Sequence, residues 1–139
     1  MIRQLSVFVD NRLGSLMDVT VQLVEAHINI KAVSSLDTPE FGILRLIVDK
    51  PTEAKEYLTE KGFVVHIHNV LGAELEDKKG NLNQLLAILA QGKQNIHYIY
   101  SLVIRDGKTP VIIFQTDDMD ETKEILLESH IRLVDEAEL

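Results

Sequence analysis

The chain has 139 residues, 45% of them hydrophobic, no cysteine and a formal net charge of −8. This length and apolar content suit one medium-sized domain or two very small ones, and they argue against a disordered chain. Without cysteine there is no disulfide, thiol nucleophile or Cys-ligated metal site. The acidic balance disfavours nucleic acids and membranes as partners, because both present negative charge. No apolar run is long enough to cross a membrane, so we expect a soluble, cytoplasmic protein.

One motif occurs twice in the chain. Segment 10–16, with the sequence DNRLGSL, aligns with segment 76–82, EDKKGNL. In this alignment Gly80 follows Gly14 by 66 residues. Self-similarity at a fixed spacing indicates an internal repeat.

A second pair of segments supports the repeat. Segment 54–58, AKEYL, aligns with segment 122–126, TKEIL, at a spacing of 68 residues. The two extra residues fit the turn-rich stretch 106–110, so one loop insertion accounts for the change in spacing. The duplication predicts two domains, residues 1–70 and residues 71–139.

The first copy is predicted to contain six elements. Alternating apolar residues predict strands, and apolar residues three or four positions apart predict helices. Pro51 suits the first turn of a helix, and Gly62 suits the residue just beyond its end. In chain order, the predicted elements are strand 4–9, helix 16–26, strands 28–36 and 42–49, helix 52–61 and strand 63–67.

The second copy repeats the order of the first. Asp106 and Gly107 predict a turn between its middle strands, and Asp117 and Asp118 place carboxylates at a helix start, where they complement the helix dipole. The fold class is therefore α+β, with two ferredoxin-like βαββαβ units and antiparallel sheets. The predicted elements are strand 71–76, helix 82–89, a strand beginning at 96–100, strand 111–114, a helix after residue 118 and strand 131–133.

Each such unit places both helices on one face of a four-stranded sheet. The other face of strand 42–49 carries Ile43 and Ile47, which is too apolar for open water. We therefore expect this face to be covered by the sister copy, with the two units packed side by side, or by another chain. Apolar positions such as Val33 and Ile99 favour a homodimer.

No catalytic arrangement emerges from the sequence. There is no Ser–His–Asp order or phosphate-binding loop, and the acidic run 117–121 lacks the glycine and terminal glutamate of a calcium loop. His66 and His68 have a spacing that can bind a transition metal, but no third ligand lies near them in the sequence. A polar strand face is the favoured interpretation of this pair. We expect no enzyme activity, no metal and no cofactor.

The remaining candidate is the corner where the first strand of each copy leads into the first helix. Gly14 and Gly80 allow a tight turn and a close approach of a ligand to the backbone. The N–H groups at a helix start can hold a carboxylate or a phosphate. A structural alternative stays open, in which the glycines only make the turn and the asparagines cap the preceding helix. Equivalent polar residues accompany the two corners: Arg12 with Asn29, and Lys78 with Asn95.

At these residues the sequence resembles the ACT domain, a small regulatory module of amino-acid metabolism. The family corner typically has an acidic residue, then x-Arg-Pro-Gly-x-Leu, and later Asn-Ile at the second strand. Both copies follow this order, and the likeness covers nearly the whole chain. The family proline is replaced by Leu13 and by Lys79, and Lys78 replaces the arginine, which gives up bidentate contact with a carboxylate. The chain resembles a stand-alone tandem ACT protein.

The resemblance implies that a free amino acid binds between paired units. The corner 11–16 would face residues 95–96, and the corner 77–82 would face residues 29–30. Helix-start N–H groups would hold the α-carboxylate, and an acidic or amide side chain would hold the α-ammonium group. The ligand-binding residues implied by the resemblance are Asn11, Arg12, Leu13, Gly14, Ser15, Leu16, Asn29, Ile30, Asp77, Lys78, Lys79, Gly80, Asn81, Leu82, Asn95 and Ile96.

Three functional hypotheses follow from the sequence. The first is an amino-acid-binding regulatory protein that signals by altering its pairing with itself or with an enzyme. The alternative is an interaction module, similar to a regulatory subunit, that has no working pocket and binds an amino-acid biosynthetic enzyme. The third is an enzyme built on the ferredoxin-like scaffold, which would need an essential titratable group that the sequence does not reveal.

Overall fold

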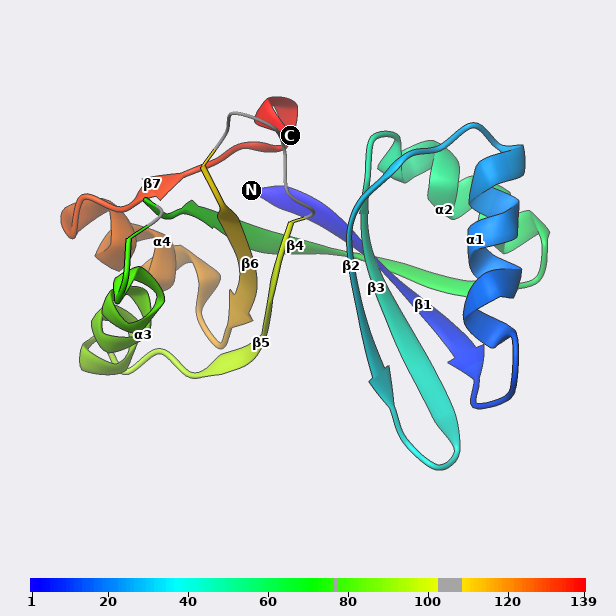
Figure 1. The fold of residues 1–139 in the computed structure, drawn as a ribbon, viewed down its shortest axis with the longest axis horizontal. Coiled ribbons are helices and arrows are strands. Elements are labelled where there is room, and N and C mark those ends of the chain that lie inside the picture. The colour runs from blue at the N-terminus through cyan, green and yellow to red at the C-terminus, as the bar shows by residue number, and fades with distance from the viewer. Residues whose placement is uncertain (77, 103–108) are drawn as a thin grey trace. The chain divides into compact units, whose positions relative to one another are not determined.

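The computed structural model describes residues 1–76, 78–102 and 109–139. It divides into two compact units, one formed by Arg3–His68 and the other by Met1–Ile2 together with Asn69–Leu139 (Figure 1). We call them the N-terminal unit and the C-terminal unit and describe each by itself. None of the helices in the described residues is long and apolar enough to cross a membrane.

The N-terminal unit has the predicted order of elements, and its strands follow the order β2-β3-β1-β4. Strand β3 pairs antiparallel with both β1 and β2. Helix α2 begins with proline at its first turn, as predicted, and Gly62 follows its end with a φ of 95°. The elements are β1 (Ile2–Asp10), α1 (Ser15–Glu25), β2 (Ile30–Asp37), β3 (Phe41–Val48), α2 (Pro51–Glu60) and β4 (Val64–Glu74).

Alternation along β1 decides which face of this sheet is buried. Leu5, Val7 and Val9 are buried against the two helices, which cover the same face (Figure 1). Burying each such side chain stabilises the fold by about 1.5–3 kcal/mol, so this face sets the register of the strand. The helices contribute Val19, Leu23, Ala54 and Leu58 to this core.

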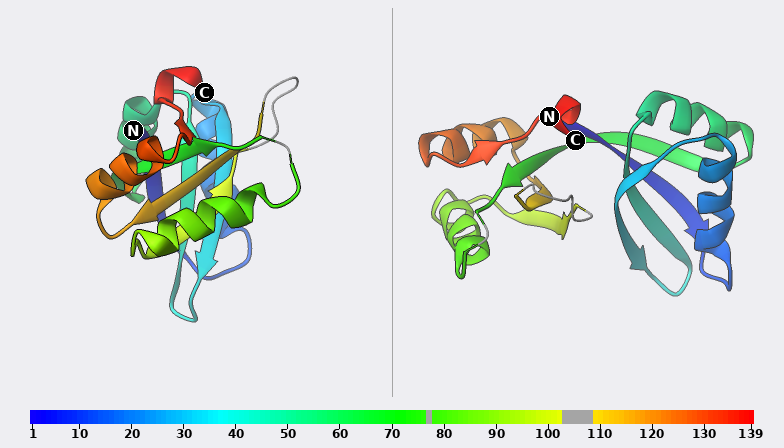
Figure 2. Two further views of the ribbon diagram at one scale, coloured as in Figure 1. Left: turned by 90° about the vertical axis from the view of Figure 1, so that its left-hand side faces the viewer. Right: turned by 45° about the horizontal axis from the view of Figure 1, so that its top comes forward.

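The C-terminal unit repeats the arrangement with the strand order β5-β6-β4-β7. Its core joins Leu71, Ala73 and Leu75 of β4 to residues of both helices, which lie on one side of the strands (Figure 2). The predicted turn at Asp106 and Gly107 lies outside the described residues. The elements after β4 are α3 (Asn81–Gln91), β5 (Ile96–Ser101), β6 (Val111–Thr116), α4 (Met119–Glu128), β7 (Arg132–Leu133) and the 3-10 helix η1 (Glu136–Glu138).

The predicted fold class is confirmed, because the βαββαβ order occurs twice with antiparallel pairing. One detail of the prediction was wrong. The strands expected at 63–67 and 71–76 form a single continuous strand, β4. No proline or acidic turn residue interrupts the join, so nothing ends the extended backbone there.

Candidate functional site

The first corner connects β1 to α1 through a turn that depends on glycine. Gly14 has a φ of 82°, in the left-handed region that side chains rarely adopt, and a Cβ added there would meet nothing within 4 Å. The N–H of Arg12 donates to the carbonyl of Asp10 (3.0 Å), and the N–H of Ser15 donates to the carbonyl of Arg12 (3.3 Å). The helix then begins with a bond from Asp18 N–H to the carbonyl of Gly14 (3.0 Å). The glycine is therefore required by the backbone, and it also leaves open space at the helix start.

The second corner reproduces this backbone 66 residues later. Gly80 has a φ of 90°, and again nothing lies within 4 Å of an added Cβ. The N–H of Lys78 donates to Glu76 (2.8 Å), that of Asn81 to Lys78 (3.3 Å) and that of Gln84 to Gly80 (2.9 Å). The predicted equivalence of the two corners thus extends to individual hydrogen bonds. Asp77, which the resemblance assigns to this corner, lies outside the described residues.

Neither corner helix is capped by a side chain. Gly14 and Gly80 occupy the cap positions of α1 and α3 and have no side-chain oxygen to accept a hydrogen bond from the first-turn amides. Helix α4 differs, because the carboxylate of Asp118 accepts a hydrogen bond from Glu121 N–H (3.0 Å). The first-turn N–H groups of a helix have no intrahelical acceptor and carry partial positive charge. At the two glycine corners they are suited to an external carboxylate.

Charged side chains at the first corner form a compact group. One guanidinium nitrogen of Arg12 donates to Asp18 (2.6 Å), and another lies 3.8 Å from the carboxylate of Asp10. The same guanidinium donates to the carbonyl of Leu13 (3.3 Å). Two carboxylates therefore share one guanidinium, and the group has a net negative charge. Arg12, expected from the sequence to contribute positive charge, is instead neutralised.

The second corner has a simpler ion pair. Lys78 lies 2.6 Å from the carboxylate of Glu76, and both side chains are 70% exposed. Their hydrogen bond lowers the pKa of Glu76 and raises the pKa of Lys78. Gln84 occupies the position that Asp18 has in the first copy, so the first turn of α3 contains no acidic residue. The Asn81 side chain donates to the carbonyl of Glu76 and closes the turn.

Each corner borders a hollow in its own unit. The hollow of the N-terminal unit has a volume of about 350 Å³, and the hollow of the C-terminal unit about 520 Å³. Equivalent positions of the two copies line the two hollows. A residue of the second copy follows its equivalent in the first by 66 positions before the loop insertion and by 68 positions after it. The first hollow is lined by Phe8, Asp10, Ser15, Asp18, Phe41 and Val64. The second is lined by their equivalents, which in the same order are Glu74, Glu76, Asn81, Gln84, Thr109 and Arg132.

The asparagines predicted to take part in binding do not lie at these corners within their own units. In the N-terminal unit, Asp10 pairs with Phe41 at the start of β3, whereas Ile30 pairs with Val48 at its end. Strand β3 spans roughly 23 Å at the rise of an extended chain. Asn29 thus lies at the far end of the sheet, where its N–H donates to Asp49 (3.0 Å).

The C-terminal unit separates the same two features. Glu74 pairs with Val111 at the start of β6, and Ile96, beside Asn95, pairs with Thr116 at its end. One unit alone therefore does not bring the corner and the asparagine together. At the rims of the corners Leu13 is fully exposed and Leu16 and Leu82 are nearly half exposed, whereas Ser15 is buried. Asn11 holds the first rim in place through a hydrogen bond to the carbonyl of Thr38 (3.0 Å).

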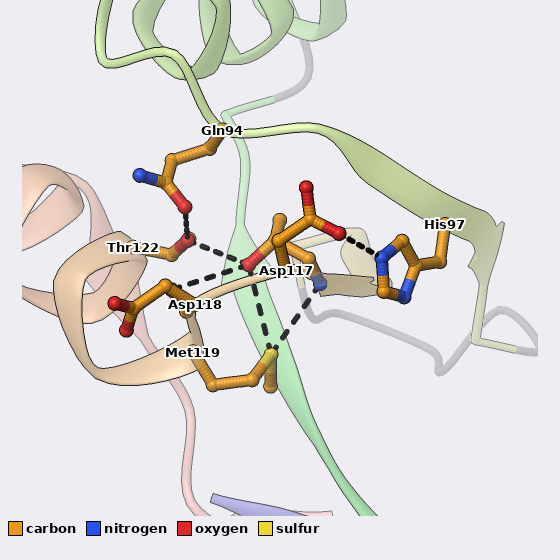
Figure 3. Close-up of polar contacts among 7 residues, drawn as sticks. Gln94, His97, Asp117, Asp118, Met119 and Thr122 are labelled. Atoms are coloured by element: carbon orange, nitrogen blue, oxygen red, sulfur yellow. Dashed lines mark hydrogen bonds and ion pairs between the residues drawn. The ribbon is translucent and has the colours of Figure 1, made fainter.

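A buried polar network beside Asn95 was not anticipated from the sequence. Thr122 donates to the side-chain oxygen of Gln94 (2.9 Å) and lies 2.6 Å from the hydroxyl of Thr116 (Figure 3). In the first copy the equivalent residues are Ile28, Val48 and Ala54, all part of the apolar core. The alignment of the two copies therefore contained a signal for this network, because three positions that are apolar in the first copy are all polar in the second.

At the surface next to this network, His97 is paired with Asp117 (Figure 3). The hydrogen bond to the Asp117 carboxylate raises the pKa of His97 above its ordinary value. His66 lies edge-on to Phe8, with ring centroids 5.7 Å apart, and 6.1 Å from His68. Within the described ranges, no three potential metal ligands gather around this pair or anywhere else.

Comparison with known families identifies the repeated unit. The family model described as "ACT domain pair" matches residues 1–139. The chain belongs to the ACT domain pair family. The resemblance seen at the glycine corners is therefore confirmed, and the fold of this ACT domain pair is that of a regulatory module.

Solved structures show the same fold. The ACT domain pair is 31% identical to protein BT0572 from Bacteroides thetaiotaomicron over 98% of this chain and 93% of that one, with a TM-score of 0.89. The ligand-free regulatory subunit of aspartate kinase from Thermus thermophilus has 16% identity, coverages of 92% and 90% and a TM-score of 0.65. The corresponding subunit from Thermus flavus has 12% identity, coverages of 92% and 92% and a TM-score of 0.60. No curated protein matches the chain.

Proposed function

We propose that this ACT domain pair is a regulatory protein, not an enzyme, that binds a free amino acid at its glycine corners. The observation that carries the proposal is the first corner, where uncapped helix amides lie next to a net negative group formed by Asp10, Arg12 and Asp18. A free amino acid has both complementary charges on adjacent atoms. Its α-carboxylate suits the first-turn N–H groups that follow Ser15, whose own N–H donates to Arg12, and its α-ammonium group suits the two aspartates.

The second corner offers the same backbone with fewer charges. The first turn of α3 beyond Asn81 would present helix amides, and Glu76 would provide the carboxylate for the ammonium group. The asparagines at the far ends of the sheets would then complete each site from another copy of the fold, as the family resemblance implies. Binding would regulate by stabilising one arrangement of copies over another, which requires a difference in affinity between the two arrangements.

Thermal unfolding against each of the twenty amino acids at millimolar concentration tests the proposal. A ligand present at about one hundred times its Kd adds roughly 2.7 kcal/mol to the free energy of unfolding, so one selective increase in Tm is expected. G14A and G80A are expected to weaken binding at their own corner, because alanine strains the left-handed backbone by about 1–2 kcal/mol and projects into the ligand space.

The Kd is read from the dependence of Tm on ligand concentration, which separates binding from the strain in the unliganded variant. The double variant G14A/G80A is expected to lose the ligand-dependent shift. An unchanged Kd in this double variant, or no shift with any amino acid, would contradict the proposal.

A second candidate, an interaction module, is supported by the outward face of α1. Met17 is 67% exposed and Val24 is 73% exposed, and their separation of seven residues places them on one side of the helix. Leu13, in the turn just before the helix, is fully exposed. We propose a second copy of the chain as the partner, and expect a homodimer mass by light scattering that M17E reduces to a monomer. A monomer that co-purifies with a biosynthetic enzyme would instead indicate the regulatory-subunit role.

A further inference from the structure

The two hollows differ in the side chains that line them, and this difference selects different ligands. We propose that the hollow of the N-terminal unit takes an amino acid with an apolar side chain, and that the equivalent hollow of the C-terminal unit excludes it. The inference rests on the proposed function and adds the side-chain class of the ligand and the number of ligands per chain. It depends on three equivalent positions that differ in chemistry.

In the N-terminal unit these positions form an apolar wall. Phe8, Phe41 and Val64 line the hollow, and they are 37%, 41% and 57% exposed. The rings of Phe8 and Phe41 have centroids 6.3 Å apart, within the range of a paired aromatic contact. Large apolar side chains left exposed around a concave site are typical of a ligand or partner surface. Here they adjoin the corner that is proposed to bind the amino-acid backbone.

In the C-terminal unit the same positions are Glu74, Thr109 and Arg132. Arg132 and Thr109 both donate to the carboxylate of Glu74, and Arg132 also donates to Glu138. The carboxylates of Glu138 and Glu74 raise the pKa of Arg132, so the guanidinium stays fully charged. The wall of this hollow is therefore a set of polar groups that already satisfy one another.

The two walls favour different side chains. An apolar side chain placed against Phe8 and Phe41 removes apolar surface of both partners from water, which is favourable. A charged side chain against these two rings would lose hydration there, and the carboxylates of the hollow, Asp10 and Asp18, are already paired with Arg12 and are proposed to hold the α-ammonium group. Against Glu74 and Arg132, an apolar side chain would have to desolvate an ion pair, whose hydration it cannot replace. Apolar ligands therefore distinguish the first hollow from the second.

Calorimetric titration of the full chain tests this assignment with leucine, phenylalanine, aspartate and lysine as probes, which share one backbone and differ in the side chain. We expect leucine or phenylalanine to bind at least tenfold more tightly than the charged probes, with one ligand per chain. F8A is expected to weaken this binding about tenfold or more, and F41A provides a second variant of the same wall. E74A and T109A, at the equivalent positions, are the matched controls and should leave the Kd within a factor of two.

The outcomes separate the assignment of an apolar ligand to the first hollow from the proposal that the chain binds an amino acid. Tighter binding of aspartate or lysine, two ligands per chain, or a Kd that responds to E74A and not to F8A or F41A would overturn the assignment while leaving amino-acid binding in place. No binding of any of the twenty amino acids would instead overturn the proposed function. Both phenylalanines are more than one third exposed, so the variants should fold, which circular dichroism checks.

Discussion

Replacing Thr122 with valine is expected to lower the free energy of unfolding of the C-terminal unit by about 1–3 kcal/mol. Thr122 is fully buried and donates its only hydroxyl proton to Gln94, so Thr116 must donate to Thr122. Valine keeps the shape of threonine but leaves the buried oxygen of Gln94 without its donor. Urea or thermal unfolding, followed by circular dichroism, measures the change.

The two copies of the fold provide the controls for this prediction. T122S keeps the hydroxyl and should lose much less stability than T122V. The triple variant Q94I/T116V/T122A installs the residues of the first copy, Ile28, Val48 and Ala54, and removes the three polar side chains at once. It should recover most of the stability lost in T122V, because replacing a whole polar network by matching apolar groups is nearly neutral or stabilising. A triple variant less stable than T122V would show that the network has another role.

The elements of this fold were predictable because each carries a local signal. The alternation of Leu5, Val7 and Val9 and the proline at the start of α2 are patterns of a few neighbouring residues. The sequence alone is therefore enough to locate the strand and the helix start. The join between the two copies was not predictable in the same way. It depends on whether one strand continues through residues 69–71, and sequence patterns specify strand identity better than strand ends.

The candidate site was predictable in its backbone and not in its charges. The glycines at 14 and 80 have the left-handed conformation that their position in the motif requires. The pairing of Arg12 with Asp18 depends on one turn of helix beyond the motif, and it reverses the sign of the charge expected at the first corner. Each wall is built from strands that are distant in sequence, such as those of Phe8 and Phe41. The difference between an apolar wall at Phe8 and a polar wall at Glu74 was therefore visible only when the fold placed these positions around the two hollows.

Adding a methyl group at Gly72 of β4 should have the next largest effect on the free energy of unfolding. A Cβ there would lie 2.6 Å from Cδ1 of Ile2 and 2.9 Å from Cγ2 of Val134, and both side chains are buried. Because neither can move into solvent, G72A is expected to cost about 1–3 kcal/mol in the free energy of unfolding.

One rescue and one matched control, measured in the same unfolding series, test this prediction. I2V removes the methyl group that clashes and should return part of the stability lost in G72A, so the two changes are expected to be non-additive. S6A is the matched control, since Ser6 is the equivalent residue of the first copy and already carries a Cβ in a buried position. Equal Tm values for G72A and the unaltered chain would mean that Ile2 and Val134 relax without cost, and the packing argument for this strand would then be wrong.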